Sequence, residues 1–74
     1  MGDIHVVELF GIGKRYDIRG SRSQRFSVVV HKDGVREIYA FEGDEDEPSA
    51  TIRLDEAEAR KIGSVLAGTY FTED

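Results

Sequence analysis

The sequence predicts a mainly β (α+β) fold: a small curled antiparallel sheet or partial barrel of about five strands, with one C-terminal helix packed over one end. Three observations predict it. Short apolar runs are separated by glycine-rich or charged turns, an Asp-Gly pair stands between two β-rich runs, and apolar residues take a helical spacing only near the C-terminus. Periodicity does not give the strand order, so the topology stays open.

The first third of the chain predicts two strands. Apolar residues dominate 4–10, and the break at 11–13, Gly-Ile-Gly, predicts a flexible corner after them. Residues 14–19 alternate between apolar and charged side chains, which is typical of a half-buried strand. Residues 20–23 supply the next turn.

The middle of the chain predicts a central hairpin. The segment 24–32 carries apolar side chains on both faces, which predicts a central strand covered on two sides. Asp33-Gly34 follows, and this pair favours a type I′ turn because both central residues of that turn need a positive φ. The returning strand is expected over 35–42, and a shorter strand over 50–54.

An acidic loop and a helix complete the chain. Five carboxylates and no apolar residue lie in 42–47, which is typical of a solvated loop. Asp55 and Glu58 have the spacing of a capping box, and Gly68 is suited to end the helix after Ala67. Gly63 weakens the helix. The apolar stripe comprises Ala59, Ile62, Val65 and Leu66.

Composition limits the class of function. The chain has 74 residues and forms one domain, which at this size has no room for a deep substrate pocket. The net charge of −5 would repel a phosphate backbone, so nucleic acid is not an expected partner. The absence of cysteine fits a reducing cytoplasm, and no apolar run is long enough to span a membrane, so direct membrane insertion is not expected.

No pattern for catalysis, a cofactor or a metal emerges. There is no cysteine, the serines show no nucleophile elbow, and only His5 and His31 could act as a base. The Gly13-Lys14 pair lacks the longer loop and the following Ser or Thr of a phosphate-binding loop. The acidic loop lacks the glycine and the distant glutamate of a calcium loop. We therefore expect a protein that is not an enzyme.

A basic, aromatic face on neighbouring strands is an alternative that the overall acidity disfavours. It would comprise Arg15, Tyr16, Arg19, Arg22, Arg25, Arg36 and Tyr39.

Four linked segments resemble a known family. They are Leu-Phe-Gly-Ile-Gly-Lys-Arg-Tyr at 9–16, Val-Val-Val-His-Lys-Asp-Gly at 28–34, Arg-Glu-Ile-Tyr at 36–39 and Leu-Asp-Glu-Ala-Glu-Ala-Arg at 54–60. Together they resemble the N-terminal domain of regulatory subunits of bacterial potassium/proton (cation/proton) antiporters. One departure is Phe10, where the family pattern has proline, so this corner is expected to be less rigid.

The resemblance implies a domain organisation. In that family a TrkA-type C-terminal domain follows, which dimerises and binds a small ligand, cyclic di-AMP in some members. Residues 1–74 would then be a single N-terminal regulatory domain, and 69–74 the stub of a linker. The implied partners are the membrane antiporter and the chain's own C-terminal domain, with no cofactor. The implied location is the cytoplasmic side of the membrane, through the partner.

The glycine-flanked corner is the expected docking site for a partner, because it displays apolar and basic side chains on an accessible loop. The residues assigned to it are Leu9, Phe10, Ile12, Lys14 and Arg15. The structural alternative is that Leu9, Phe10 and Ile12 only close the end of the barrel. His5 and His31 are candidates for pH sensitivity, because histidine titrates near neutrality.

A different class of function stays open at this point: a stand-alone acidic cytoplasmic adaptor that binds a soluble protein partner by accepting a peptide strand at its sheet edge. A homodimer through the sheet edge, or through Tyr70 and Phe71, is a further alternative.

Overall fold

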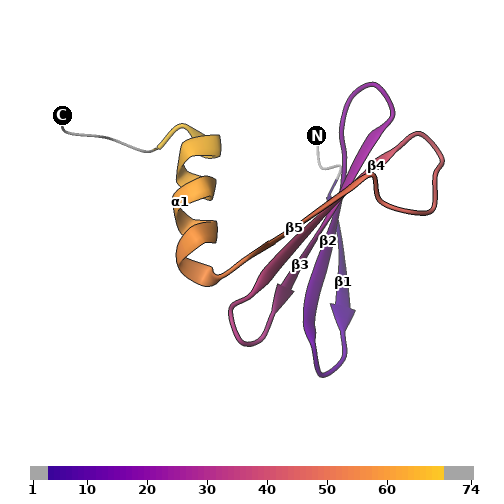
Figure 1. Cartoon of the computed structure of the whole chain (residues 1–74). Helices are drawn as coiled ribbons and strands as arrows, with labels where there is room; N and C mark the ends of the chain where they lie inside the picture. The colour runs from indigo at the N-terminus through magenta and orange to yellow at the C-terminus, as the bar shows by residue number, and fades with distance from the viewer. Residues whose placement is uncertain (1–3, 70–74) are drawn as a thin grey trace.

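The computed structural model describes residues 4–69 and shows an open antiparallel sheet followed by one helix (Figure 1). The strands are β1 (Ile4–Leu9), β2 (Gly13–Arg19), β3 (Gln24–His31), β4 (Arg36–Glu42) and β5 (Ala50–Leu54), and the helix is α1 (Glu56–Ala67). Each strand pairs with the next one in the chain, in the order β1-β2-β3-β4-β5. The predicted mainly β fold with about five strands and a C-terminal helix is confirmed.

The sheet is open, with β1 and β5 as its two edges. The sheet is therefore not closed into a beta barrel, and that expectation is wrong. Closing a barrel requires a progressive stagger between strands. Here the strands pair almost level with one another, since Ile4 lies opposite Ile18 and Ile18 lies opposite Phe26. The alternative in which Leu9, Phe10 and Ile12 close the end of a barrel therefore does not apply.

The register separates the side chains onto two faces, because directly opposite residues point to the same side of a sheet. We call one the apolar face. It comprises Ile4, Val6, Tyr16, Ile18, Phe26, Val28, Val30, Ile38, Ala40, Ala50, Ile52 and Leu54. The opposite side, here called the polar face, carries mainly charged and hydroxyl groups, among them Asp17, Glu37 and Arg53.

Strand β3 is central, as predicted, but it is not covered on both faces. Val29 is the one buried apolar side chain among the described residues, with 7% exposure, and it lies on the polar face. Val28 and Val30, on the apolar face, are only half-buried. The prediction of two covered faces was wrong because no described element packs closely on the apolar face.

The predicted Asp33-Gly34 hairpin forms between β3 and β4, but its turn is not type I′. The Gly34 N–H donates to the His31 carbonyl at 3.0 Å, so the central residues are Lys32 and Asp33, and neither has a positive φ. Gly34, at φ +98°, takes the left-handed position after the turn. The Asp33 carboxylate accepts a hydrogen bond from the Val35 N–H at 3.1 Å, which stabilises this longer connection.

Helix α1 begins and ends as predicted. The Glu58 N–H donates to the Asp55 carboxylate at 2.7 Å, and the Asp55 N–H donates to the Glu58 carboxylate at 2.9 Å. Gly68 ends the helix at φ +76°. No residue of α1 is buried, and its contacts with the sheet are mainly with β5. The expectation that it packs over one end of the sheet is therefore wrong.

Candidate functional site

The connection between β1 and β2 forms an exposed tip. The Ile12 N–H donates to the Leu9 carbonyl at 2.9 Å, and Gly11 takes φ +77°, so the chain reverses within three residues. Phe10 is 96% exposed and Ile12 is 49% exposed. A phenylalanine without cover at a turn contributes nothing to a core, so this tip is suited to contact another molecule.

Gly13 fixes this tip against the neighbouring hairpin. It has φ +155°, and a Cβ at this position would lie 2.0 Å from the Val30 carbonyl oxygen. Only glycine fits so close to another backbone. The tip is therefore held by the sheet, although its side chains are exposed.

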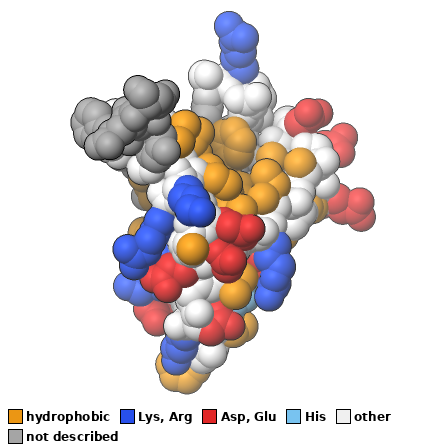
Figure 2. Space-filling view, turned by 60° about the vertical axis from the view of Figure 1, so that its left-hand side comes forward, with side chains coloured by type: hydrophobic (Ala, Val, Ile, Leu, Met, Phe, Trp, Pro, Cys, Tyr) orange, Lys and Arg blue, Asp and Glu red, His pale blue; other side chains and the backbone are white. Residues whose placement is uncertain are grey.

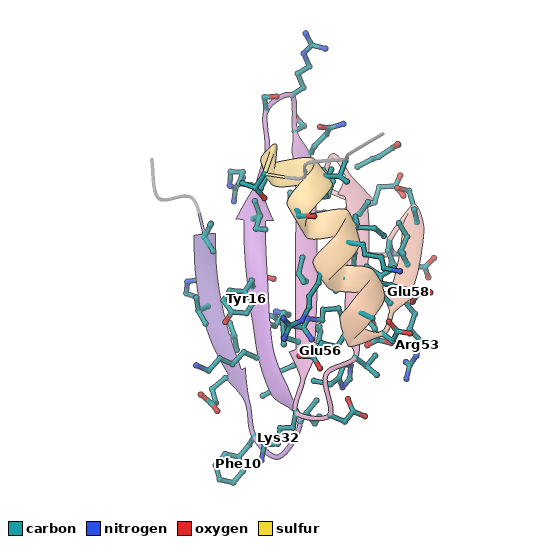
Figure 3. The ribbon with its side chains drawn as sticks, turned by 90° about the vertical axis from the view of Figure 1, so that its left-hand side faces the viewer. Phe10, Tyr16, Lys32, Arg53, Glu56 and Glu58 are labelled. Carbon is teal, nitrogen blue, oxygen red and sulfur yellow. The ribbon has the colours of Figure 1, made fainter. Side chains whose placement is uncertain are left out.

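Lys32, which the sequence analysis did not assign to the site, lies beside the tip. Its N–H donates to the Ile12 carbonyl at 2.9 Å, which joins the β1–β2 connection to the β3–β4 turn. Lys14 and Lys32 line one shallow hollow of ≈270 Å³ at this end of the sheet. Figure 3 shows Phe10 and Lys32 at the same end of the sheet. We call Phe10, Ile12, Lys14 and Lys32 the tip surface.

Only three of the five predicted docking residues belong to the tip surface. These three are Phe10, Ile12 and Lys14. Arg15 points to the polar face, where its Nε and terminal nitrogen donate to the Asp17 carboxylate at 3.2 and 3.0 Å. Leu9 is half-buried at the end of β1. Lys14 and Arg15 are adjacent in a strand, so their side chains necessarily point to opposite faces.

Glu37 is the centre of a second cluster, on the polar face. Its Oε1 lies 2.8 Å from the His31 Nε2 and accepts a hydrogen bond from the Tyr39 hydroxyl at 3.1 Å. Its Oε2 accepts a hydrogen bond from Arg53 at 3.0 Å. One carboxylate therefore connects β3, β4 and β5. This partner of His31 lies six residues away in sequence, and only the strand register identifies it.

These contacts change the acid–base behaviour of the cluster. The hydrogen bond with His31 lowers the pKa of Glu37 most, and the contacts with Tyr39 and Arg53 add to this effect against the opposing effect of burial. Burial and the neighbouring Glu37 carboxylate raise the pKa of Tyr39. Near neutral pH the cluster therefore holds an ionised Glu37 and a neutral Tyr39.

Asp17 is held in a similar way at the other end of the polar face. Burial alone would raise its pKa, but hydrogen bonds from Ser27, at 2.8 Å, and from Arg15 outweigh burial and lower it. His5 also lowers the pKa of Asp17 through its charge. The two histidines predicted to sense pH therefore each lie near a carboxylate, His5 near Asp17 and His31 against Glu37.

A hollow of ≈580 Å³ adjoins Asp17 and is lined by Arg15, Arg19 and Arg25. Three arginines suggest an anion site, but two of them already have partners. Arg15 pairs with Asp17, and Arg25 donates to the carbonyls of the acidic loop at Gly43 and Glu45, at 3.0 and 2.7 Å. The Arg25 guanidinium also lies 5.0 Å from the centre of the Phe41 ring. Arg15 and Arg25 therefore have structural roles.

No cluster suited to a metal ion occurs within residues 4–69. The acidic loop is bound to the sheet through its backbone carbonyls and Arg25, while its carboxylates are exposed. Its backbone carbonyls, and not its charges, hold it in place.

The sequence profile of the family described as "K(+)/H(+) antiporter subunit KhtT, N-terminal domain" matches residues 2–70, nearly the whole chain. The chain belongs to this family. The resemblance to antiporter regulatory subunits, drawn from four short segments, is confirmed at the level of this N-terminal domain.

The curated relatives of the chain include two that are named as antiporter subunits. The chain is 40% identical over 65 residues to the K(+)/H(+) antiporter subunit KhtT of Bacillus subtilis, a match that covers 86% of this chain and 39% of that protein. It is 39% identical to the protein YrvC of the same organism over 65 residues, with the same coverage. It is 34% identical over 62 residues to the ammonium/H(+) antiporter subunit AmhM of Alkalihalophilus pseudofirmus, covering 82% of this chain and 37% of that protein.

The domain thus spans less than half of the length of these relatives. The match covers only the N-terminal domain, so the TrkA-type C-terminal domain stays an expectation, and of the predicted linker stub at 69–74 only Thr69 lies among the described residues. Tyr70 and Phe71 lie outside them too. No helix within 4–69 is long and apolar enough to cross a membrane.

Proposed function

We propose that this domain is a non-enzymatic regulatory module of a membrane cation/proton antiporter, acting through protein–protein contact. Membership of the KhtT N-terminal family supports the antiporter as partner. The observation that carries the proposal is the tip surface, where Phe10 is 96% exposed on a turn that hydrogen bonds join to the neighbouring hairpin. The module acts at the cytoplasmic face of the membrane, to which the antiporter recruits it.

The chemistry of the tip surface favours an acidic partner with an apolar pocket. The chain as a whole carries a net charge of −5, yet two lysines, Lys14 and Lys32, line the hollow at the end of the sheet where Phe10 is exposed, together with one carboxylate, Glu8. A phenylalanine anchor near two basic groups combines hydrophobic burial with charge complementarity. Burying one such side chain contributes about 1.5–3 kcal/mol to binding.

The regulatory signal reaches this module from a TrkA-type C-terminal domain that binds a small ligand. The signal changes whether the tip surface binds the antiporter or that C-terminal domain. Such a shift requires that the ligand favour one of the two contacts. The His31–Glu37 contact supports a second input, pH, because protonation of His31 strengthens its attraction to Glu37. Measuring regulation of ion transport over a pH series, in the wild type and in His31→Gln and His5→Gln variants, tests this input: the same pH dependence in all three would remove it.

The first experiment is the capture of the native protein. An antibody to this domain is used to isolate it from gently solubilised source cells, and mass spectrometry identifies its length and partners. We expect a longer chain together with a multi-pass antiporter. An 8.3 kDa chain with soluble partners alone would instead favour the acidic adaptor, for which the open edges of β1 and β5 supply a docking edge.

The second experiment tests the tip surface in that native subunit. Phe10→Ala, and Lys14→Ala combined with Lys32→Ala, should each weaken regulation of ion transport in membrane vesicles. Arg19→Ala is the matched control, since Arg19 is an exposed basic residue at the opposite end of β2. Equal loss in the control, or full regulation in both tip variants with an intact fold, would contradict this docking surface.

A further inference from the structure

The first residue of helix α1 lies against the turn between β3 and β4. The Glu56 side chain approaches Gly34 so closely that a Cβ added to this glycine would lie 3.3 Å from the Glu56 Oε1 and 3.4 Å from the Glu56 Cβ. The strand register explains this contact, because Leu54 lies opposite Arg36 and only Asp55 separates β5 from the helix. The helix therefore begins beside the turn that Gly34 completes.

Two arginines order the groups that meet at this contact. Arg36 donates a hydrogen bond to the Gly34 carbonyl at 2.5 Å, and Arg60, one helical turn after Glu56, donates to the Glu56 Oε2 at 3.0 Å. The Arg60 bond occupies one carboxylate oxygen, while the other oxygen lies next to Gly34. A carboxylate in the first turn also interacts favourably with the helix dipole. Glu56 is therefore fixed by its own helix while it contacts the turn.

The rest of α1 is held loosely. Its apolar stripe faces solvent, with Ile62 41%, Val65 60% and Leu66 79% exposed. Figure 2 shows hydrophobic side chains exposed in the upper part of the molecule. The contacts between α1 and the sheet are mainly with β5. A helix held by so few contacts can detach locally at a small cost in free energy. The placement of α1 therefore depends on its beginning, where Glu56 lies.

The turn that Glu56 contacts also carries part of the tip surface. The Gly34 N–H donates to the His31 carbonyl at 3.0 Å, which closes the turn around Lys32. The Lys32 N–H then donates to the Ile12 carbonyl at 2.9 Å. Figure 3 shows Glu56 at the start of α1 and Lys32 at the end of the sheet. Two backbone hydrogen bonds therefore connect the residue under Glu56 to the tip surface.

We propose that Glu56 is a positioning residue for the tip surface. Its contact with Gly34 keeps the β3–β4 turn, and with it Lys32, in the geometry that binds the partner. This inference rests on the proposed function of the tip surface. Gly34 has φ +98°, and glycine is the residue with the widest choice of backbone conformations. When α1 detaches, the turn loses the contact that restricts this glycine, and Lys32 is less often in place.

The consequence is a connection between α1 and docking that needs no direct contact. A force or a binding partner that pulls α1 away from the sheet weakens docking at the tip surface, and a partner bound at the tip surface favours the attached helix. Helix α1 is the last described element of the chain, so a segment that follows it is well placed to act on it.

Amide hydrogen exchange in the 74-residue chain is the first test. Glu56→Ala should speed exchange of the Lys32 amide by at least about threefold, because the turn opens more often. Alanine is a good helix former, so α1 itself should persist. Glu56→Gln keeps the size of the side chain and should keep exchange slow. The Val29 amide, in the centre of β3, is the internal reference. Unchanged exchange at Lys32, or equal acceleration at Val29, would overturn the proposal.

Regulation of ion transport by the native subunit, measured in membrane vesicles, is the second test. Glu56→Ala should weaken regulation and Glu56→Gln should retain it, whereas Lys61→Ala, which changes an exposed residue of the same helix, should have no effect. Loss of regulation in the tip variants but not in Glu56→Ala would reject the positioning role and leave the docking surface intact. Full regulation in the tip variants, with faster Lys32 exchange in Glu56→Ala, would reject the docking function and leave only the contact between α1 and the turn.

Discussion

Across the β3–β4 hairpin, the His31 Nε2 lies 2.8 Å from the Glu37 Oε1, and this carboxylate is the only acceptor within residues 4–69 that binds side chains from three strands. Its side chain is 20% exposed, so solvent only partly screens these contacts. The ionised form of Glu37 therefore stabilises the middle of the sheet, and its protonation should weaken it.

Glu37→Gln should lower the free energy of unfolding by about 1 kcal/mol at neutral pH, since charge-assisted hydrogen bonds are replaced by neutral ones. The folded state lowers the pKa of Glu37, so its contribution is complete above the ordinary value of 4.5 and is lost as pH falls through the folded value. Urea unfolding over a pH series measures this. The wild type and the variant should converge in acid. Glu42→Gln, exposed at the end of the same strand, is the control. Equal free energies of unfolding for the wild type and Glu37→Gln at neutral pH would contradict the role of Glu37.

Gly13→Ala should destabilise the fold by at least about 2 kcal/mol, because the added methyl group meets the Val30 carbonyl and the backbone has a positive φ. Denaturant unfolding gives the loss, and amide exchange should locate it at the tip. Gly11→Ala separates the two causes, since its φ is +77° but nothing lies within 4 Å of the added Cβ. A smaller loss at Gly13 than at Gly11 would show that the close approach is not decisive.

Gly63→Ala should stabilise helix α1 by about 0.5–1 kcal/mol, because glycine is a poor residue for a helix interior and no neighbour lies within 4 Å of the new Cβ. Far-ultraviolet circular dichroism should show more helix. Unchanged or lower helicity would indicate that Gly63 is required by a contact of another kind, such as a close approach of a second helix.

Asp55→Ala should loosen α1 by about 1 kcal/mol and leave the sheet intact. The reason is that the Asp55 carboxylate caps the Glu58 N–H, whereas the helix contacts little besides β5. Hydrogen exchange should become faster in 56–67 and stay unchanged in β3. Arg60→Ala, which removes only the exposed pair with Glu56, is the milder comparison. Faster exchange in β3 would mean that helix and sheet unfold together.

Local chemistry allowed most elements to be predicted from the sequence. Asp55, Glu58 and Gly68 fixed both ends of α1, because capping depends on neighbouring residues alone. The alternation in 14–19 predicted β2 to within one residue. The turn after β3 was misassigned because Asp-Gly also suits a longer connection, in which glycine alone takes the positive φ. The positive φ pair occurs instead at Arg22 and Ser23, where no glycine marked it.

The composition of the site depended on strand order, which the sequence does not reveal. Lys32 joins Ile12 only because β2 lies beside β3, and Glu37 meets His31 only through the β3–β4 register. Arg15 was grouped with Lys14 by proximity in sequence, although alternation along a strand separates them. Cover for the apolar face could not be inferred either, because an apolar pattern predicts burial without identifying what buries it.

The strand order has a consequence for how the protein folds. Every strand pairs with its neighbour in the sequence, so the paired residues are separated by few residues and the contact order is low. Chains of this kind fold fast, because closing the short loop between two neighbouring strands costs little conformational entropy before the strands pair. Because β5 and its helix lie at an edge of the sheet, their local detachment would leave the other four strands paired.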